Sequence, residues 1–222
     1  MSASISFTPR ERRLIARLST PLAVQRYLNR LPYNTEPPPA GATLRSFRGV
    51  VRRGCAHCLE AALFAAVVLE QHGYPPLVLS FESIDDLDHV IFVYRHRGRW
   101  GSVARSRDPG LHGRLPVFRA PRALALSYVD PYVDFTGRVT AYAVVDLKRM
   151  MGDYDWRTAD TNVLKVERML LDYPHRKIAT SDRRFKWLKK RYREFREANA
   201  GKKPLYYRGR ERWTPIPVEF GQ

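Results

Sequence analysis

The first thirty residues mix short apolar groups with arginines and predict two helices. Thr8 and Thr20 each precede a proline, and a hydroxyl residue followed by proline is typical of a helix N-cap and the first helical position. The second helix is expected over residues 22–31, with its core-facing positions at Leu22, Val24, Tyr27, Leu28 and Leu31. Residues 33–53 are ambiguous, because prolines break their first part, and extended backbone is favoured only around residues 43–47.

Residues 58–72 form the clearest helix in the sequence. The segment has no glycine or proline, and leucine, alanine and valine keep one broad face apolar. Gly73 follows at the position expected for a helix C-cap, and two prolines at 75 and 76 prevent continuation. Apolar side chains on most sides predict that this helix is buried in the core.

Strand-like segments follow the buried helix. Residues 77–81 are short and apolar, and residues 89–95 are β-branched and aromatic. Arg97-Gly-Arg separates the second run from residues 100–103, which predicts an antiparallel hairpin, and a further strand is expected over residues 139–145. This order predicts an α+β fold in which a mostly antiparallel sheet packs on the helix that begins at Cys58.

The last seventy residues differ from the rest in composition. Residues 176–212 contain fifteen Lys or Arg against four Asp or Glu, and a helix is expected over residues 182–199. Its apolar stripe consists of Phe185, Leu188, Tyr192 and Phe195. We therefore divide the chain into an N-terminal helical segment (1–35), a core (36–150) and a basic extension that packs on the core (151–222).

Charge and cysteine content narrow the class of protein. Across 222 residues, 39 Lys and Arg outnumber 22 Asp and Glu, and the formal net charge of +17 would attract a polyanion. Two cysteines are too few for a secreted disulfide scaffold. The N-terminus lacks a signal-peptide pattern and no apolar run is long enough to span a bilayer, so we expect a cytoplasmic protein without a transmembrane segment.

Cys58 is the residue that best fits a chemical role. A helix N-terminus presents unpaired N–H groups and a positive dipole end, which favour a thiolate. His89 begins a strand expected to lie against the same helix, and an imidazole beside the thiol can act as its base. A single cysteine at a buried helix start is more often a small core residue, so the order and spacing of the surrounding residues decide between the two interpretations.

That spacing resembles the transglutaminase-like superfamily. In residues 54–74, Cys58 opens the helix, Glu60 supplies an acidic residue two positions later, and Gly73 ends the helix about four turns on. Cys55 then lies in the preceding loop. After a short strand, His89 opens a strand that forms a hairpin with a second strand carrying an aromatic residue. The resemblance covers roughly residues 50–109.

The resemblance implies a papain-like fold and a Cys–His–Asp site that performs acyl transfer or hydrolysis at amide or ester carbonyls. Cys58 would be the nucleophile and His89 the base. The third position is occupied by Asp108, which precedes a proline, or by Ser106. A protein or peptide amide is the implied substrate, no metal or other cofactor is expected, and the choice between water and an amine as acceptor stays open. Residues 105–142 have no counterpart in the family, and they either cover the cleft or form an ordered loop.

Other interpretations fit part of the sequence. Cys55-Ala-His57-Cys58 is a C-x-x-C that opens a helix, as in thiol–disulfide oxidoreductases, but the segment before it is broken by charge rather than forming an apolar strand. Cys55, His57, Cys58 and His89 or His72 offer zinc ligands without a second pair at matched spacing. The fold can also persist without catalysis, as a scaffold.

The basic extension supports one more interpretation, an anionic partner such as a nucleic acid. Cations there alternate with aromatic side chains that could stack on bases. These are Phe185, Trp187, Tyr192, Phe195, Tyr206, Tyr207 and Trp213. The sequence contains no recognised nucleic-acid-binding motif, and a solvated basic helix whose aromatic stripe packs on the core explains the same pattern.

Overall fold

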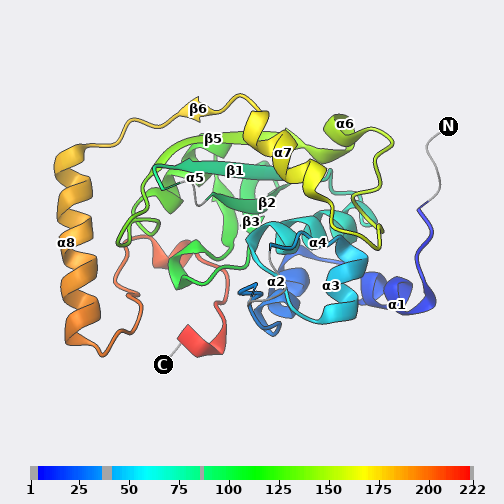
Figure 1. Cartoon of the computed structure of the whole chain (residues 1–222), viewed down its shortest axis with the longest axis horizontal. Helices are drawn as coiled ribbons and strands as arrows, with labels where there is room; N and C mark the ends of the chain where they lie inside the picture. Colours follow the sequence, from blue (N-terminus) through cyan, green and yellow to red (C-terminus); the bar gives the residue numbers. More distant parts are fainter. Residues whose placement is uncertain (1–4, 37–41, 86–87, 221–222) are drawn as a thin grey trace.

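The computed structural model describes residues 5–36, 42–85 and 88–220, which form an antiparallel sheet covered by helices (Figure 1). The sheet has six strands in the order β4-β3-β2-β1-β5-β6, and each neighbouring pair is antiparallel. The strands are β1 (Leu77–Ser83), β2 (His89–His96), β3 (Arg99–Val103), β4 (Arg114–Phe118), β5 (Val139–Asp146) and β6 (Arg176–Lys177).

The helices are distributed along the whole chain. They are α1 (Pro9–Arg17), α2 (Pro21–Asn29), α3 (Phe47–Arg53), α4 (Cys58–Glu70), α5 (Pro121–Val129), α6 (Leu147–Met151), α7 (Leu164–Asp172) and α8 (Asp182–Ala198). Three single turns of 3₁₀ helix are η1 (Pro109–Leu111), η2 (Arg210–Arg212) and η3 (Val218–Phe220). Figure 1 shows α4 between the sheet and the helices α2 and α3, and α8 at the side of the molecule.

Strand β2 is buried on both of its faces. Val90 and Phe92 belong to the apolar cluster that contains α4, whereas Ile91 and Val93 belong to the cluster that contains α5. Because alternate residues of a strand point to opposite faces, a strand between two cores needs an uninterrupted apolar run. The sequence of β2 has that run, and it brings the first residue of the strand, His89, to the N-terminal end of α4.

Helix α4 is the centre of the larger core. Every residue from Ala61 to Leu69 is fully inaccessible to solvent, and α4 packs against β2, α3 and α2. The helix ends at Glu70, and Gly73 follows at a φ of +82°, a conformation that favours glycine. The α+β fold, with a cysteine-bearing helix packed on an antiparallel sheet, is therefore confirmed.

The predicted helix starts at Thr8 and Thr20 are also confirmed, since both hydroxyls accept a backbone N–H of the first turn. The favoured extended backbone at residues 43–47 is wrong at its end, because Phe47 begins α3. Ser46 caps this helix by accepting the Gly49 N–H. The four arginines between residues 45 and 53 hid its buried positions, which are Phe47, Val50 and Val51. Leu22, predicted to face the core, is 37% exposed.

The basic extension contacts the core through α8 and the residues after it. Leu188 and Tyr192 of α8 are buried, and the Tyr192 ring meets Phe135 with a centroid distance of 5.2 Å. This agrees with a stripe that packs on the core, while the proposed anionic partner stays a prediction. The division at residues 35 and 150 also stays a prediction. The α4 cluster includes buried residues of α1, α2 and α7.

Within the residues that the structure describes, no helix is both long and apolar enough to cross a membrane. The predicted cytoplasmic location is not tested by this finding.

Candidate active site

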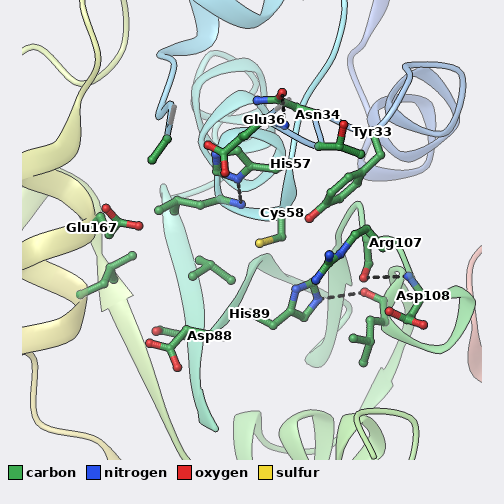
Figure 2. Close-up of a pocket in the computed structure, with 18 of the residues that line it drawn as sticks. Tyr33, Asn34, Glu36, His57, Cys58, Asp88, His89, Arg107, Asp108 and Glu167 are labelled. Atoms are coloured by element: carbon green, nitrogen blue, oxygen red, sulfur yellow. Dashed lines mark hydrogen bonds between the residues drawn. The ribbon is translucent and has the colours of Figure 1, made fainter. Parts of the chain in front are cut away.

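Cys58 is the first residue of α4, and its side chain faces a cleft. His57 precedes it as the N-cap residue, and the helix begins with a capping box between His57 and Glu60. The cysteine is half-buried. Figure 2 shows the Cys58 side chain close to the Tyr33 hydroxyl and the His89 ring. The helix start predicted from the sequence thus presents the thiol to the cleft.

His89 also lies beside the Cys58 sulfur. Its Nε2 is 3.0 Å from the carbonyl oxygen of Leu111. A carbonyl can only accept, so Nε2 carries the proton, and Nδ1 is left as the nitrogen that interacts with the thiol. The ring is buried and also packs near Phe81 and Tyr128, with centroid distances of 6.2 and 6.3 Å. The imidazole is therefore fixed in one tautomer and one orientation.

The surroundings of Cys58 favour its thiolate. Burial by itself raises the pKa of the Cys58 thiol. Hydrogen bonding to the His57 and His89 rings, together with their positive charge, outweighs burial and holds this pKa well below its ordinary value. The structure therefore brings together the residues that the sequence assigned as nucleophile and base, in a state suited to a thiolate–imidazolium pair.

His57 is a second imidazole beside the thiol. Its Nδ1 accepts the Leu59 N–H at 3.2 Å, and its Nε2 donates to the Thr43 carbonyl at 2.8 Å. Burial opposes a charge on this ring, but hydrogen bonding to Cys58 and the negative charges of Cys58 and Glu60 raise the pKa of His57 to about 9. With this pKa the ring is protonated at neutral pH, and its Nδ1 then donates to the Cys58 thiolate instead of accepting the Leu59 N–H.

Tyr33 completes the ring of groups around the sulfur. A parallel bridge between Tyr33 and Ala56 holds the residue beside the helix start. Burial and the negative charge of Cys58 raise the pKa of Tyr33, whose hydroxyl interacts with both the backbone and the thiol of Cys58. The phenol therefore stays protonated and is available as a hydrogen-bond donor at the head of α4.

A buried arginine holds the loop that carries the Leu111 carbonyl. The guanidinium of Arg114 donates to the carbonyls of Gly110, at 2.6 Å, and His112, at 2.7 Å, and to Ser127. It lies between the rings of Tyr128 and Trp213, at 4.0 and 4.8 Å from their centroids. Burial lowers the pKa of Arg114 to about 10, so the side chain is charged at neutral pH.

His112 ties the same loop to the C-terminal residues. Its Nδ1 donates to the Asp108 carbonyl at 3.0 Å, and its Nε2 accepts from Arg105 at 3.2 Å. Burial and the neighbouring Arg105 lower the pKa of His112 to about 3, which keeps the ring neutral. Arg105 in turn pairs with Glu219 at 3.0 Å. The loop that orients His89 is thus fixed by two buried arginines.

Glu60 organises the opposite side of the site. Its buried carboxylate accepts the backbone N–H groups of His57 and Arg45, both at 3.0 Å, and the side-chain amide of Asn34 at 3.1 Å. The Arg45 guanidinium lies 3.5 Å away. In the sequence analysis Glu60 was only part of the spacing that resembles the transglutaminase-like superfamily. In the structure its hydrogen bonds join the segment before α3 to the N-terminus of α4.

The cleft in front of Cys58 has a volume of about 450 Å³. The segments around Tyr33 and Thr43 form one wall, the loop from Ser106 to Leu111 forms another, and α7 forms a third. Pro131, Tyr132 and Asp134 also line it, so part of the segment that has no counterpart in the family does border the cleft.

The structure places the two candidates for the third position beside the cleft. The Asp108 carboxylate pairs with Lys203 at 2.9 Å, and the buried Ser106 hydroxyl accepts the Asp108 N–H at 3.1 Å. The Nε2 of His89 donates to the Leu111 carbonyl. Asp108 as the orienting residue stays a prediction.

The alternatives based on Cys55 are less well supported by the geometry. Both cysteines are free thiols, and Cys55 lies 3.5 Å from the Arg45 guanidinium. The element before the C-x-x-C is α3, where thioredoxin-type oxidoreductases have a strand. Within the described ranges, no group of three His, Cys, Asp or Glu side chains could hold a metal ion. His72 instead contacts the Ile15 carbonyl at 2.9 Å.

Three contributors were missed by the sequence interpretation. Tyr33 and the Leu111 carbonyl are each more than twenty residues from their partner, and a carbonyl carries no side-chain signal. His57 was considered only as part of a C-x-x-C or zinc pattern. His57 follows Gly54 by three residues, stands directly before a buried helix and precedes Glu60 by three residues. This spacing fits a helix N-cap with a capping box, and it could have indicated the role of His57.

Comparison with known proteins adds little to this geometry. No protein-family model matches the chain, and a search of curated proteins finds no match. Among solved structures, the chain is similar to Legionella pneumophila LapG at 14% sequence identity and a TM-score of 0.38. The match covers 71% of this chain and 84% of that one. This is a distant likeness of fold, and the functional argument depends on the site itself.

Proposed function

We propose that the protein is a cysteine-dependent acyl-transfer or amide-hydrolysing enzyme of the transglutaminase-like type. The observation that carries the proposal is a half-buried thiol at a helix N-terminus, with its pKa lowered by two imidazoles, facing a cleft large enough for a peptide segment. A structural cysteine has no need of this arrangement, because a core thiol is stable when it is neutral.

In the proposed reaction, the Cys58 thiolate attacks an amide or ester carbonyl and forms a C–S bond. The carbonyl oxygen takes the negative charge of the tetrahedral intermediate, beside the Cys58 N–H and the Tyr33 hydroxyl as donors. When the C–N or C–O bond breaks, the His89 imidazolium gives its proton to the leaving group. Water or an amine then attacks the acyl-enzyme, returns a proton to His89 and releases Cys58.

We assign the orientation of His89 in this reaction to the Leu111 carbonyl. A neutral carbonyl at 3.0 Å fixes the tautomer as a carboxylate would. It stabilises the imidazolium less, because it carries only a partial charge. Asp108, three residues before Leu111, has a carboxylate whose negative charge is offset by Lys203.

The pH dependence of thiol labelling tests the dyad. With Cys55→Ser as the parent, we expect iodoacetamide to label Cys58 at a rate that stays high at neutral pH and falls only well below the ordinary thiol pKa of about 8.5. His89→Ala removes one source of the lowered pKa, so the midpoint moves toward that value. The labelling rate is measured by mass spectrometry at each pH.

An ester substrate separates a working enzyme from an inactive scaffold. Mixing the parent with p-nitrophenyl acetate is expected to release a burst of one nitrophenolate per Cys58, because acylation precedes slower deacylation. Cys58→Ala abolishes the burst. If Cys58 labels at low pH but no burst appears in any ester tested, the fold is a scaffold with a reactive thiol and the proposed catalysis is wrong.

Asp108→Asn distinguishes the two candidates for orienting His89. Because the Leu111 carbonyl holds Nε2, we expect this change to move the Cys58 labelling midpoint by less than about half a pKa unit, or ~0.7 kcal/mol. Lys203→Met serves as the matched control, since it removes the partner of Asp108. A midpoint shift as large as that of His89→Ala would assign the orienting role to Asp108.

A further inference from the structure

Two imidazole rings lie beside the Cys58 thiol, and the main chain holds both in the same way. The Nε2 of His57 lies 2.8 Å from the Thr43 carbonyl. The Nε2 of His89 lies 3.0 Å from the Leu111 carbonyl. A carbonyl only accepts, so each Nε2 carries a proton and each ring has its Nδ1 for the hydrogen bond to Cys58. The proposed reaction needs one ring as its acid and base, which leaves the second ring without a step.

The two rings differ in the charge beside them. In the view of Figure 2, His57 lies above Cys58 and His89 lies below it. The buried Glu60 carboxylate is 3.9 Å from the Nε2 of His57. The Nε2 of His89 has the neutral Leu111 carbonyl instead. A carboxylate stabilises a lasting positive charge on a ring, whereas a neutral acceptor lets the ring gain and lose its proton. This difference favours His57 as the charged ring and His89 as the ring that transfers protons.

The electrostatic surroundings of His57 agree with a lasting charge. Burial opposes the charge, but hydrogen bonding to Cys58 and the negative charges of Cys58 and Glu60 raise the pKa of His57 to about 9. At neutral pH its Nδ1–H therefore donates to the thiolate. The charged and titratable groups around the ring are Cys58 and Glu60 of α4, with Tyr33, Glu36 and Arg45 of the segments before it.

The negative charge that His57 faces changes position during acylation. When the Cys58 sulfur forms the C–S bond, its charge moves to the former carbonyl oxygen, which is two bonds from the sulfur. A sulfur bonded to carbon is a weak acceptor, so the Nδ1–H of His57 loses its partner at that moment. An imidazolium next to the sulfur is thus placed where the negative charge of the intermediate develops.

We propose that His57 is a second catalytic residue, whose imidazolium stabilises first the Cys58 thiolate and then the oxyanion of the tetrahedral intermediate. The inference rests on the proposed function of Cys58 and assigns a further role at that same site. His57 keeps its proton throughout, and its Nδ1–H exchanges the sulfur for the oxyanion as acceptor. The leaving group takes its proton from His89. The charge of His57 adds to the neutral donors, which are the Cys58 N–H and the Tyr33 hydroxyl.

Comparing acylation with alkylation tests this role, because only acylation forms an oxyanion. In the Cys55→Ser parent, the burst rate with p-nitrophenyl acetate is divided by the rate at which iodoacetamide labels Cys58 at the same pH. Both reactions need the thiolate, so this acylation-to-alkylation ratio cancels the ionised fraction of Cys58. Because p-nitrophenolate leaves without a proton, the ratio does not depend on proton donation by His89.

His57→Asn removes the charge and keeps the helix cap, because asparagine is a favoured N-cap residue whose oxygen can accept the Leu59 N–H. We expect the ratio at neutral pH to fall about 100-fold, the usual effect of losing one oxyanion donor. His72→Asn makes the same substitution just after the other end of α4 and should leave the ratio unchanged. A fall of less than about threefold for His57→Asn, or an equal fall in both variants, would overturn the proposal.

The pH dependence of the parent is a second test, which needs no variant to fold. The positive charge on His57 is present below its pKa of about 9 and is lost above it. The ratio should therefore stay level from neutral pH to about 8 and fall about 100-fold at higher pH. In His57→Asn the ratio should be low at every pH. A ratio that stays level in the parent while the pH rises well past 9 contradicts the assigned role.

The two proposals fail in different ways. If the parent gives no burst with any ester although Cys58 is labelled, the proposed catalysis is wrong, and the role of His57 is wrong with it. If the parent gives a burst but the ratio depends neither on His57 nor on pH, the proposed function remains and only the second catalytic residue is excluded.

Discussion

Replacing Arg114 with methionine is expected to lower the free energy of unfolding by about 3 kcal/mol and to slow the reaction of Cys58 as well. The guanidinium satisfies the carbonyls of Gly110 and His112 together with Ser127, and the arginine side chain is fully buried. Methionine fills the space between Tyr128 and Trp213. It leaves the Gly110 carbonyl without this donor and the His112 carbonyl with the Tyr128 hydroxyl alone, and each buried unpaired acceptor costs about 1–3 kcal/mol.

The effect on Cys58 follows from the position of these carbonyls on either side of Leu111. When the loop is no longer fixed, the Leu111 carbonyl no longer holds His89 in one orientation, so the Cys58 labelling midpoint moves upward. Urea denaturation measures the first effect, and iodoacetamide labelling against pH measures the second in conditions where the variant is folded.

Two further variants make this prediction specific. Arg114→Lys keeps the charge but cannot reach every acceptor, so it should lie between the parent and Arg114→Met in both measurements. Arg119→Met removes an exposed arginine just after the same strand and should change stability by less than about 0.5 kcal/mol. If Arg114→Met has the same urea denaturation midpoint as the parent, or leaves the pH midpoint of Cys58 labelling unchanged, the loop does not depend on this side chain as described.

The parts of the fold that could be predicted are those with local signals. Thr8 and Thr20 satisfy the first-turn N–H groups of their own helices, and Gly73 takes up a positive φ three residues after α4 ends. The interactions lie within a few residues, so the sequence displays them. Strand β2 could also be predicted, because burial on both faces requires a continuous apolar run.

The parts that could not be predicted depend on contacts between distant segments. Helix α3 is amphipathic, but with seven residues it has too few turns for its periodicity to stand out among arginines. Tyr33 reaches Cys58 through a bridge to Ala56, and Leu111 reaches His89 through its main chain. A contact made by a backbone carbonyl, or a bridge between residues more than twenty positions apart, cannot be predicted from a single sequence.

These distant contacts bear directly on the proposed chemistry. The nucleophile and base were identified from the order of Cys58 and His89 along the chain, which is a matter of topology. Their protonation is tuned by His57 and by the segments before α3 and after β3, whose positions depend on buried polar groups. The core of the chain thus sets where the two residues meet, and the buried charges set how the thiol ionises.

The second large effect is expected from Glu60→Ala, which should lower the free energy of unfolding by about 3–5 kcal/mol. Its carboxylate is fully buried and accepts the N–H groups of His57 and Arg45 and the amide of Asn34. Alanine leaves these donors without a partner and leaves the Arg45 guanidinium, 3.5 Å away, uncompensated. Urea denaturation at neutral pH measures the loss.

Glu60→Gln separates the contribution of the charge from that of the shape. The amide keeps one acceptor oxygen but turns an NH₂ toward groups that are themselves donors, so an intermediate loss of about 1–3 kcal/mol is expected. Glu197→Ala, on the exposed face of α8, is the matched control and should change stability by less than about 0.5 kcal/mol. A loss for Glu60→Ala no larger than that of Glu197→Ala would contradict the assigned hydrogen bonds.

Both Glu60 variants also act on the head of α4, because Glu60 closes the capping box with His57. Without it, His57 loses the acceptor of its backbone N–H and one of the negative charges that raise the pKa of its ring. A less basic His57 stabilises the Cys58 thiolate less, so the labelling midpoint of Cys58 should rise in Glu60→Gln even where the protein is fully folded. A buried carboxylate next to a thiolate would ordinarily disfavour it, and a midpoint that falls instead would mean that direct repulsion outweighs the action through His57.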